Sequence, residues 1–227
     1  MNPFSDSQVL ANWAASTLGA CRIDEVARWR MLEYWFQVEL FRAVQSGKAG
    51  AWQHVGNFEH PYHTNHPRSG SKTNTKWIDL VFAEPGPEGP KKVVWCELKD
   101  IGRSQGTVEN NAKNLGNDLA ALWSIDPERT RDLWLNPQPH SMDRGRLEEW
   151  RRFGERIDGG EQLIAQIVLY HKSFCTEVPL DRIVELWMAS FAAKSKASTA
   201  IDPYSIASSE TDAFVVLGLV GKPACAG

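Results

Sequence analysis

The sequence predicts an α/β fold in which a mixed central sheet is flanked by helices. Three observations support this class. A long helical pattern precedes two strand-like segments, a turn rich in Pro and Gly joins these segments, and a second helical pattern separates them from another apolar strand. The order helix, strands, helix, strand is typical of helices layered on a sheet. The segments lie at residues 23–45, 77–82, 91–99, 107–124 and 162–171.

The first helix is predicted over residues 24–46, a stretch that contains neither Gly nor Pro. Arg30, Glu33 and Gln37 share one face of this helix, which we interpret as the solvent-facing side. The opposite side is mostly apolar, and Glu39 lies within it. Because an unpaired carboxylate is costly to bury, Glu39 needs a partner inside the protein.

The two strands after this helix carry charges near their ends. Asp79 lies in "WIDLVF", whereas Glu97 and Lys99 lie in "KKVVWCELK". Side-chain direction repeats every second residue along a strand, so Glu97 and Lys99 point to one face, and Asp79 can face them from the neighbouring strand. Glu39 can approach from the packed helix. These carboxylates suit a hard divalent cation, Mg²⁺ or Mn²⁺, and Lys99 would orient the nucleophile or stabilise developing charge.

This pattern resembles the PD-(D/E)xK nuclease superfamily, which has the restriction-endonuclease-like fold. The matching residues are Asp79, the run Glu97-Leu98-Lys99, and Glu39 in "WFQVELF". The core order of that fold also matches residues 24–171. Ile78 stands where the proline that gives the family its name would be.

The resemblance implies a metal-dependent endodeoxyribonuclease that hydrolyses phosphodiester bonds, with DNA preferred over RNA. Asp79, Glu97 and Glu39 would hold Mg²⁺ or Mn²⁺, and Lys99 would assist the attacking water. The alternative is a relative of the same fold that has lost turnover and acts as a binding or assembly subunit. A net charge of −3 leaves room for a partner protein that supplies DNA affinity, or for a homodimer.

The rest of the chain extends this core. A short helix is expected across residues 143–156, a helix at 180–194 and a last strand at 213–221. We therefore expect one nuclease-like domain over residues 1–227, with the core at 24–171 and a C-terminal elaboration at 172–227.

Two further groups are secondary candidates for the site. Lys113 lies on the helix after Lys99, where a solvated helix face is the equally good interpretation. His60 and His63 belong to a run of four histidines that also includes His54 and His66. These imidazoles would supply part of a transition-metal site, but a polar loop with ordinary hydrogen bonds is the favoured interpretation.

Composition places the protein among soluble globular chains, and we expect it in the cytoplasm. The hydrophobic fraction is 42% and the charged fraction 23%. The first residues, "MNPFSDSQ", do not have the pattern of a signal peptide, and no apolar run is long enough for a bilayer. The four cysteines are widely spaced, which favours free thiols over a disulfide framework or a zinc knuckle.

Overall fold

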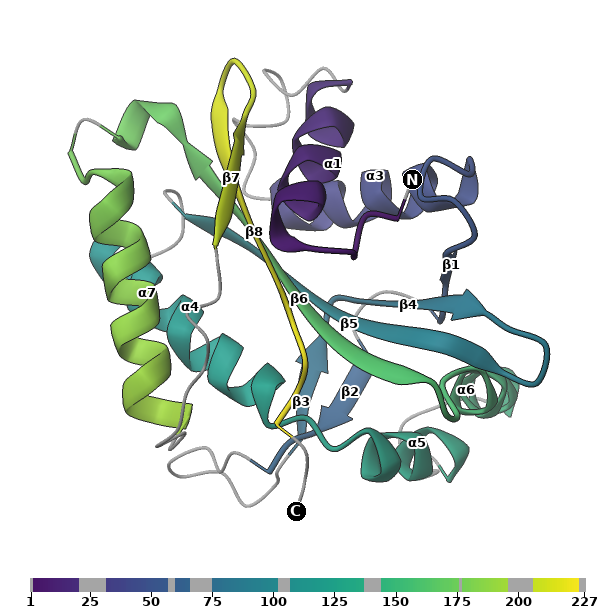
Figure 1. The fold of residues 1–227 in the computed structure, drawn as a ribbon. Coiled ribbons are helices and arrows are strands. Elements are labelled where there is room, and N and C mark those ends of the chain that lie inside the picture. Colours follow the sequence, from purple (N-terminus) through teal and green to yellow (C-terminus); the bar gives the residue numbers. More distant parts are fainter. Residues whose placement is uncertain are drawn as a thin grey trace.

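A six-stranded mixed sheet forms the centre of the protein in the computed structural model (Figure 1). The structure describes residues 2–20, 32–56, 60–65, 75–101, 107–136, 144–175, 177–195 and 206–224. The strands follow the order β1-β4-β5-β6-β8-β7. Their bounds are β1 Gln53–His54, β4 Leu80–Pro85, β5 Pro90–Ile101, β6 Glu161–His171, β8 Phe214–Gly221 and β7 Ala207–Glu210.

The pairing of β4, β5 and β6 confirms the predicted mixed sheet. β4 and β5 are antiparallel neighbours, whereas β5 and β6 run parallel. Parallel neighbours need a crossover between them, and this one carries three helices. These helices are α4 (Val108–Trp123), α5 (Pro127–Leu135) and α6 (Arg144–Arg156).

Helices cover both faces of the sheet. α1 (Ser7–Gly19) and α3 (Leu32–Gln45) lie on one face, and α4 and α7 (Leu180–Ser195) lie on the other (Figure 1). Successive side chains of β5 point to opposite faces of the sheet, so this strand contributes to the core on each face. Val94 and Cys96 pack in the core under α1 and α3, while Trp95 packs in the core under α4 and α7. Strands buried on both faces read as continuous apolar runs, which explains "VVWC".

A glycine allows α4 and α7 to approach closely. A Cβ atom on Gly116 would lie 2.4 Å from the carbonyl oxygen of Trp187 and 2.5 Å from the backbone nitrogen of Phe191. Real Cβ atoms do not come that close to backbone, so only glycine fits at this crossing. The contact fixes α4 over the sheet, and α4 carries a side chain of the site described below.

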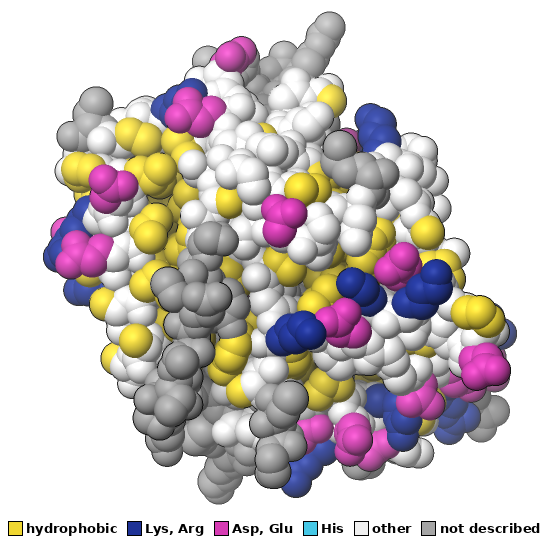
Figure 2. Space-filling view, in the orientation of Figure 1, with side chains coloured by type: hydrophobic (Ala, Val, Ile, Leu, Met, Phe, Trp, Pro, Cys, Tyr) yellow, Lys and Arg dark blue, Asp and Glu magenta, His cyan; other side chains and the backbone are white. Residues whose placement is uncertain are grey.

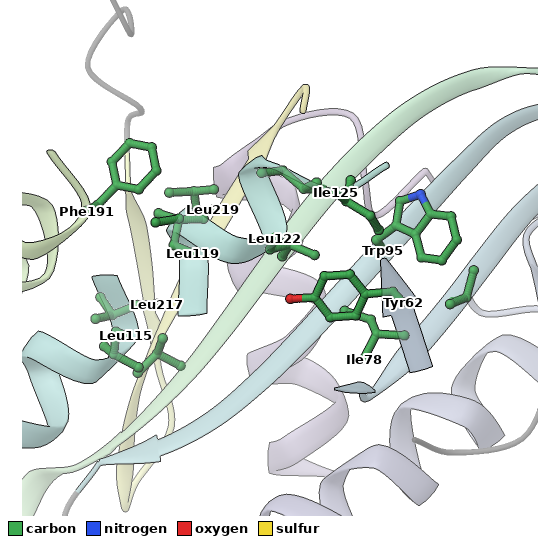
Figure 3. Packing of buried hydrophobic residues seen from close by; sticks show 14 of the residues in the cluster. Tyr62, Ile78, Trp95, Leu115, Leu119, Leu122, Ile125, Phe191, Leu217 and Leu219 are labelled. Carbon is green, nitrogen blue, oxygen red and sulfur yellow. The ribbon is translucent and has the colours of Figure 1, made fainter. Parts of the chain in front are cut away.

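The predicted strand "WIDLVF" is split at Asp79. Residues Leu80–Pro85 form β4, whereas β3 (Thr75–Ile78) leaves the central sheet and pairs with β2 (His60–His63). Figure 3 shows the packing that holds this small sheet in place, with Tyr62 and Ile78 near Trp95 of β5. The prediction of two adjacent strands is correct for β4 and β5, and the change of sheet at Asp79 is an added feature.

Several elements differ from the sequence-based expectation. α1, α5 and β7 were not predicted, and the residues taken as a polar loop after His54 include β2. In α1, Asp6 caps the helix by accepting a hydrogen bond from the Val9 amide at 2.8 Å. The first part of the predicted helix 24–46 lies outside the described residues. The last strand, β8, pairs with β6 inside the central sheet.

The surface and the cysteines add two observations. On the face in Figure 2, Lys and Arg side chains are interspersed with Asp and Glu side chains, without a large area of one sign. Cys96 and Cys175 are free thiols, and the other two cysteines lie outside the described residues. Within the described residues, the helices are all too short or too polar to cross a bilayer.

Candidate functional site

Asp79 lies where β3 leaves the central sheet, and its carboxylate replaces a missing strand partner. Leu80 pairs with Cys96, so a continued strand would place Ile78 opposite Leu98, but Ile78 pairs with His60 instead. There the Asp79 Oδ2 atom accepts a hydrogen bond from the Leu98 amide at 2.6 Å. The Asp79 side chain is buried, with a relative exposure of 8% for the residue. The break between β3 and β4 therefore places the Asp79 carboxylate against the backbone of β5.

Glu97 and Lys99 of β5 lie at this same place. The Lys99 Nζ atom is 2.8 Å from Glu97 Oε1 and 3.5 Å from Glu33 Oε1 of α3. Glu97 is also buried. The structure thus brings together Asp79, Glu97 and Lys99, as the sequence predicts.

Helix α3 contributes Gln37 and Glu33 to the site. Gln37 Nε2 donates to Asp79 Oδ1 at 2.9 Å, and the Gln37 side chain is buried. The face with Glu33 and Gln37, predicted to be solvent-facing, therefore faces β5 and Asp79. We call Asp79, Glu97, Lys99, Glu33 and Gln37 the Asp79 cluster.

Glu39, the predicted helix ligand, is oriented elsewhere. Its Oε1 atom forms an ion pair with Arg42 Nη1 at 2.8 Å. Glu39 and Gln37 are two positions apart, which is about 200° around a helix, so the two side chains point to nearly opposite sides. Because Gln37 contacts Asp79, the carboxylate of Glu39 points away from the Asp79 cluster. A polar residue four positions after Glu33 was the signal that could have identified Gln37.

Asp79 and Glu97 of the cluster are hard to ionise. Burial, followed by the charge of Glu97, holds the pKa of Asp79 well above its ordinary value. Burial raises the pKa of Glu97 to about 7, with Asp118 and Glu33 adding to the rise and Lys99 opposing it. Burial acts to lower the pKa of Lys99, but the neighbouring carboxylates outweigh it and raise that pKa. The cluster therefore holds crowded negative charge around one ammonium group.

Helix α4 and strand β6 complete the surroundings. Asp118 of α4 accepts from Lys76 Nζ of β3 at 3.1 Å, and Lys76 is buried. Gln166 of β6 is the register partner of Glu97, and it has no exposed surface. In the part of the chain that the structure describes, Gln166 Oε1 has no hydrogen-bond partner. Lys113, the predicted secondary candidate on α4, lies on the exposed side of that helix.

The donor set of the cluster fits a hard cation in part. Within the described residues, no group of three or more His, Cys, Asp or Glu side chains is arranged to hold a metal ion. Two buried carboxylates do converge, and Gln37 Oε1 beside them is buried and has no hydrogen-bond partner among the described residues. Oxygen donors of this kind are the ligands of Mg²⁺ and Mn²⁺, which keep several waters. Asp79 and Glu97 would hold such an ion, with the Gln37 carbonyl oxygen nearby.

His54 and His60 lie among aromatic rings. His60 packs on Trp134, Trp150 and Phe153, with ring centroids 4.9 to 5.5 Å apart. His54 lies against Phe82, and burial lowers its pKa to about 4.

We call His54 and His60 the histidine cluster. His63 is half-buried in β2, and His66 lies outside the described residues. Neutral imidazoles in apolar surroundings act as packing groups, which agrees better with a structural role than with a metal site.

Comparison with known proteins gave no match: neither family models, nor curated proteins, nor solved structures resemble this chain significantly. The chemistry of the Asp79 cluster therefore has to be inferred from its own geometry.

Proposed function

We propose that the protein is a Mg²⁺- or Mn²⁺-dependent nuclease that hydrolyses phosphodiester bonds, with DNA as the preferred substrate. The observation that carries this proposal is the convergence of Asp79, Glu97 and Lys99 at one buried site on adjacent elements. Burying two neighbouring acids costs free energy, and ionisable groups with perturbed pKa values are concentrated at functional sites. A divalent cation would offset the mutual repulsion of the two carboxylates.

The order of elements supports the same proposal. Helix α3 precedes β4 and β5, and α4 lies between β5 and the parallel strand β6. The resembled nuclease fold has this core order, with its acids on the strands that correspond to β4 and β5. In this chain Asp79 stands at the start of β4, and Glu97 and Lys99 stand near the end of β5.

Each residue of the cluster has a defined task in this proposal. A bound Mg²⁺ would polarise the scissile phosphate and lower the pKa of a bound water. Asp79 is held in a fixed orientation by the Leu98 amide and by Gln37, so its oxygens are positioned before any ligand binds. Lys99 places an ammonium group beside the two carboxylates, where it can hydrogen-bond a phosphate oxygen or an attacking water.

A second candidate is a nuclease-like subunit that binds nucleic acid, or assembles with a partner protein or a second copy, without turnover. One observation favours it. Helix α3 offers the neutral Gln37 where we expected the carboxylate of Glu39, and its Glu33 pairs with Lys99, so two carboxylates rather than three would hold the ion. Fewer charged ligands give weaker binding of a hard cation.

Plasmid nicking with Mn²⁺ distinguishes the two candidates. We expect Asp79→Asn and Lys99→Ala each to slow nicking by about a hundredfold or more, because each removes a group that acts on developing charge. Asp79→Asn preserves the size of the side chain, which limits effects on folding. Glu39→Gln is the matched control, since it removes a carboxylate from the same helix outside the cluster.

Two outcomes contradict the nuclease proposal. Equal nicking by the wild type, Asp79→Asn and Lys99→Ala would reject this site. No cleavage of plasmid or of single-stranded DNA by the wild type with either metal, while the protein still binds DNA, would support the binding subunit.

A further inference from the structure

Two large apolar side chains remain exposed among the described residues, and each is close along the chain to a residue of the Asp79 cluster. They are Tyr34, with 49% of its surface exposed, and Trp77, with 58%. Tyr34 follows Glu33 in α3, and Trp77 precedes Asp79 by two residues. Single exposed apolar residues are ordinary on protein surfaces. Two exposed rings from separate elements next to one polar site call for a specific explanation.

The fold itself keeps both rings at the surface. In β3, Lys76 and Ile78 are buried on one face, so the strand alternation directs Trp77 to the opposite face. In α3, Tyr34 lies three positions before Gln37, so the two side chains are neighbours on the helix surface. Because Gln37 contacts Asp79, the phenol ring lies beside the helix face that meets the cluster.

The charges of the described residues here do not by themselves attract a polyanion. Among these residues, four carboxyl groups accompany two ammonium groups around the cluster, and the whole chain has a net charge of −3. Affinity for nucleic acid that rests on phosphate contacts requires an excess of basic groups. Stacking of bases on aromatic rings does not require one, and it tolerates any sequence because every base has a flat face.

We propose that this site takes single-stranded nucleic acid, and that Trp77 and Tyr34 stack on unpaired bases next to the phosphate at the Asp79 cluster. The inference rests on the proposed function, since it names the substrate class of the same site. In a duplex the faces of the bases are already stacked on one another, so the two rings have no partner there. The structure therefore favours single strands, frayed ends or flaps over an intact duplex.

Fluorescence anisotropy tests the inference without any hydrolysis. A labelled single-stranded oligodeoxynucleotide, its duplex with the complementary strand, and the RNA of the same sequence are titrated in EDTA. We expect the single strands to bind tighter than the duplex. Trp77→Leu and Tyr34→Leu should each weaken single-strand binding about tenfold, as the loss of one stacked base implies. Trp77→Phe and Tyr34→Phe keep a ring and should stay within about threefold of the wild type.

The leucine and phenylalanine variants separate stacking from general apolar contact. Leucine keeps an apolar side chain at an exposed position, so folding is preserved, which circular dichroism can verify. Equal affinity of the wild type for duplex and single strand would overturn the inference. So would full binding by Trp77→Leu and Tyr34→Leu, or the absence of binding to any of the three nucleic acids.

The outcome is independent of the test of hydrolysis. If the protein nicks plasmid DNA but binds single strands no better than duplex, the stacking proposal fails alone. If it binds single strands through Trp77 but cleaves nothing with Mn²⁺, the hydrolysis proposal fails alone.

Discussion

The Asp79 cluster and the histidine cluster both bury ionisable side chains, but they do so in opposite ways. Around Asp79, acids meet an ammonium group, an amide and a backbone N–H. Around His60, an imidazole meets three aromatic rings. The acids around Asp79 lie next to polar and charged partners, whereas the His60 ring lies against apolar surfaces. Of the two, only the Asp79 cluster presents carboxylate oxygens for a cation and an ammonium group for a phosphate. The closeness of four histidines in the sequence was therefore the weaker indication of a functional site.

The largest expected effect comes from the histidine cluster. His60→Ala should lower the free energy of unfolding by about 3 kcal/mol, because it leaves a cavity between Trp134, Trp150 and Phe153. His63→Ala, at a half-buried position, should cost less than about 1 kcal/mol. Urea unfolding monitored by circular dichroism measures both.

The alternative that His60 and His63 form part of a transition-metal site is tested by adding zinc to the same proteins. If His60 is a packing residue, zinc should not raise the melting temperature of the wild type, and the loss in His60→Ala should be the same with and without EDTA. A loss of stability seen only in zinc-loaded protein would instead favour a histidine-ligated metal site.

The next effect is a pH dependence of opposite sign in the two clusters. The pKa of Glu97 is raised from 4.5 to about 7, so the folded state holds an extra proton between these values and this contribution to stability falls as pH rises. The pKa of His54 is lowered from 6.5 to about 4, so the unfolded state takes up the extra proton and stability falls as pH drops. Each contribution amounts to at most about 3 kcal/mol, from about 1.4 kcal/mol per pKa unit.

Variants separate these opposing slopes in EDTA. Over pH 4 to 7, Glu97→Gln removes one of the contributions that fall with pH, so its melting temperature should rise with pH relative to that of the wild type. His54→Phe should leave the Glu97 slope, so that its melting temperature falls with pH. Parallel pH profiles for the two variants would mean that the two clusters do not differ as described.

The smallest expected effect concerns Glu39. Its ion pair with Arg42, whose side chain is 68% exposed, should contribute less than about 1 kcal/mol. Glu39→Gln should therefore melt close to the wild type, and the rise in melting temperature on adding Mn²⁺ should be unchanged. Asp79→Asn should lose that rise, because it removes a ligand of the ion. A smaller rise in melting temperature with Mn²⁺ for Glu39→Gln than for the wild type would instead indicate that Glu39 is a ligand of the ion.

The sequence by itself determined the sheet and the residues on its central strands. The apolar runs before Glu97 and around Leu163 predict strands buried on both faces, and the period of two in β5 places Glu97 and Lys99 on one side. These are local properties, because strand formation and side-chain alternation follow from neighbouring residues. The Pro- and Gly-rich turn also fixed the antiparallel pairing of β4 with β5.

Only the tertiary structure decided which face of α3 meets the site. Helical periodicity groups Gln37 with the polar Arg30 and Glu33 and places Glu39 among apolar residues, so periodicity alone favoured Glu39 as the residue that meets the site. The choice depends on the break at Asp79, where a carboxylate replaces a strand and needs a second donor, which Gln37 supplies. The hydrogen bond between Gln37 and Asp79 joins residues 42 positions apart in the sequence, so no local sequence pattern predicts it.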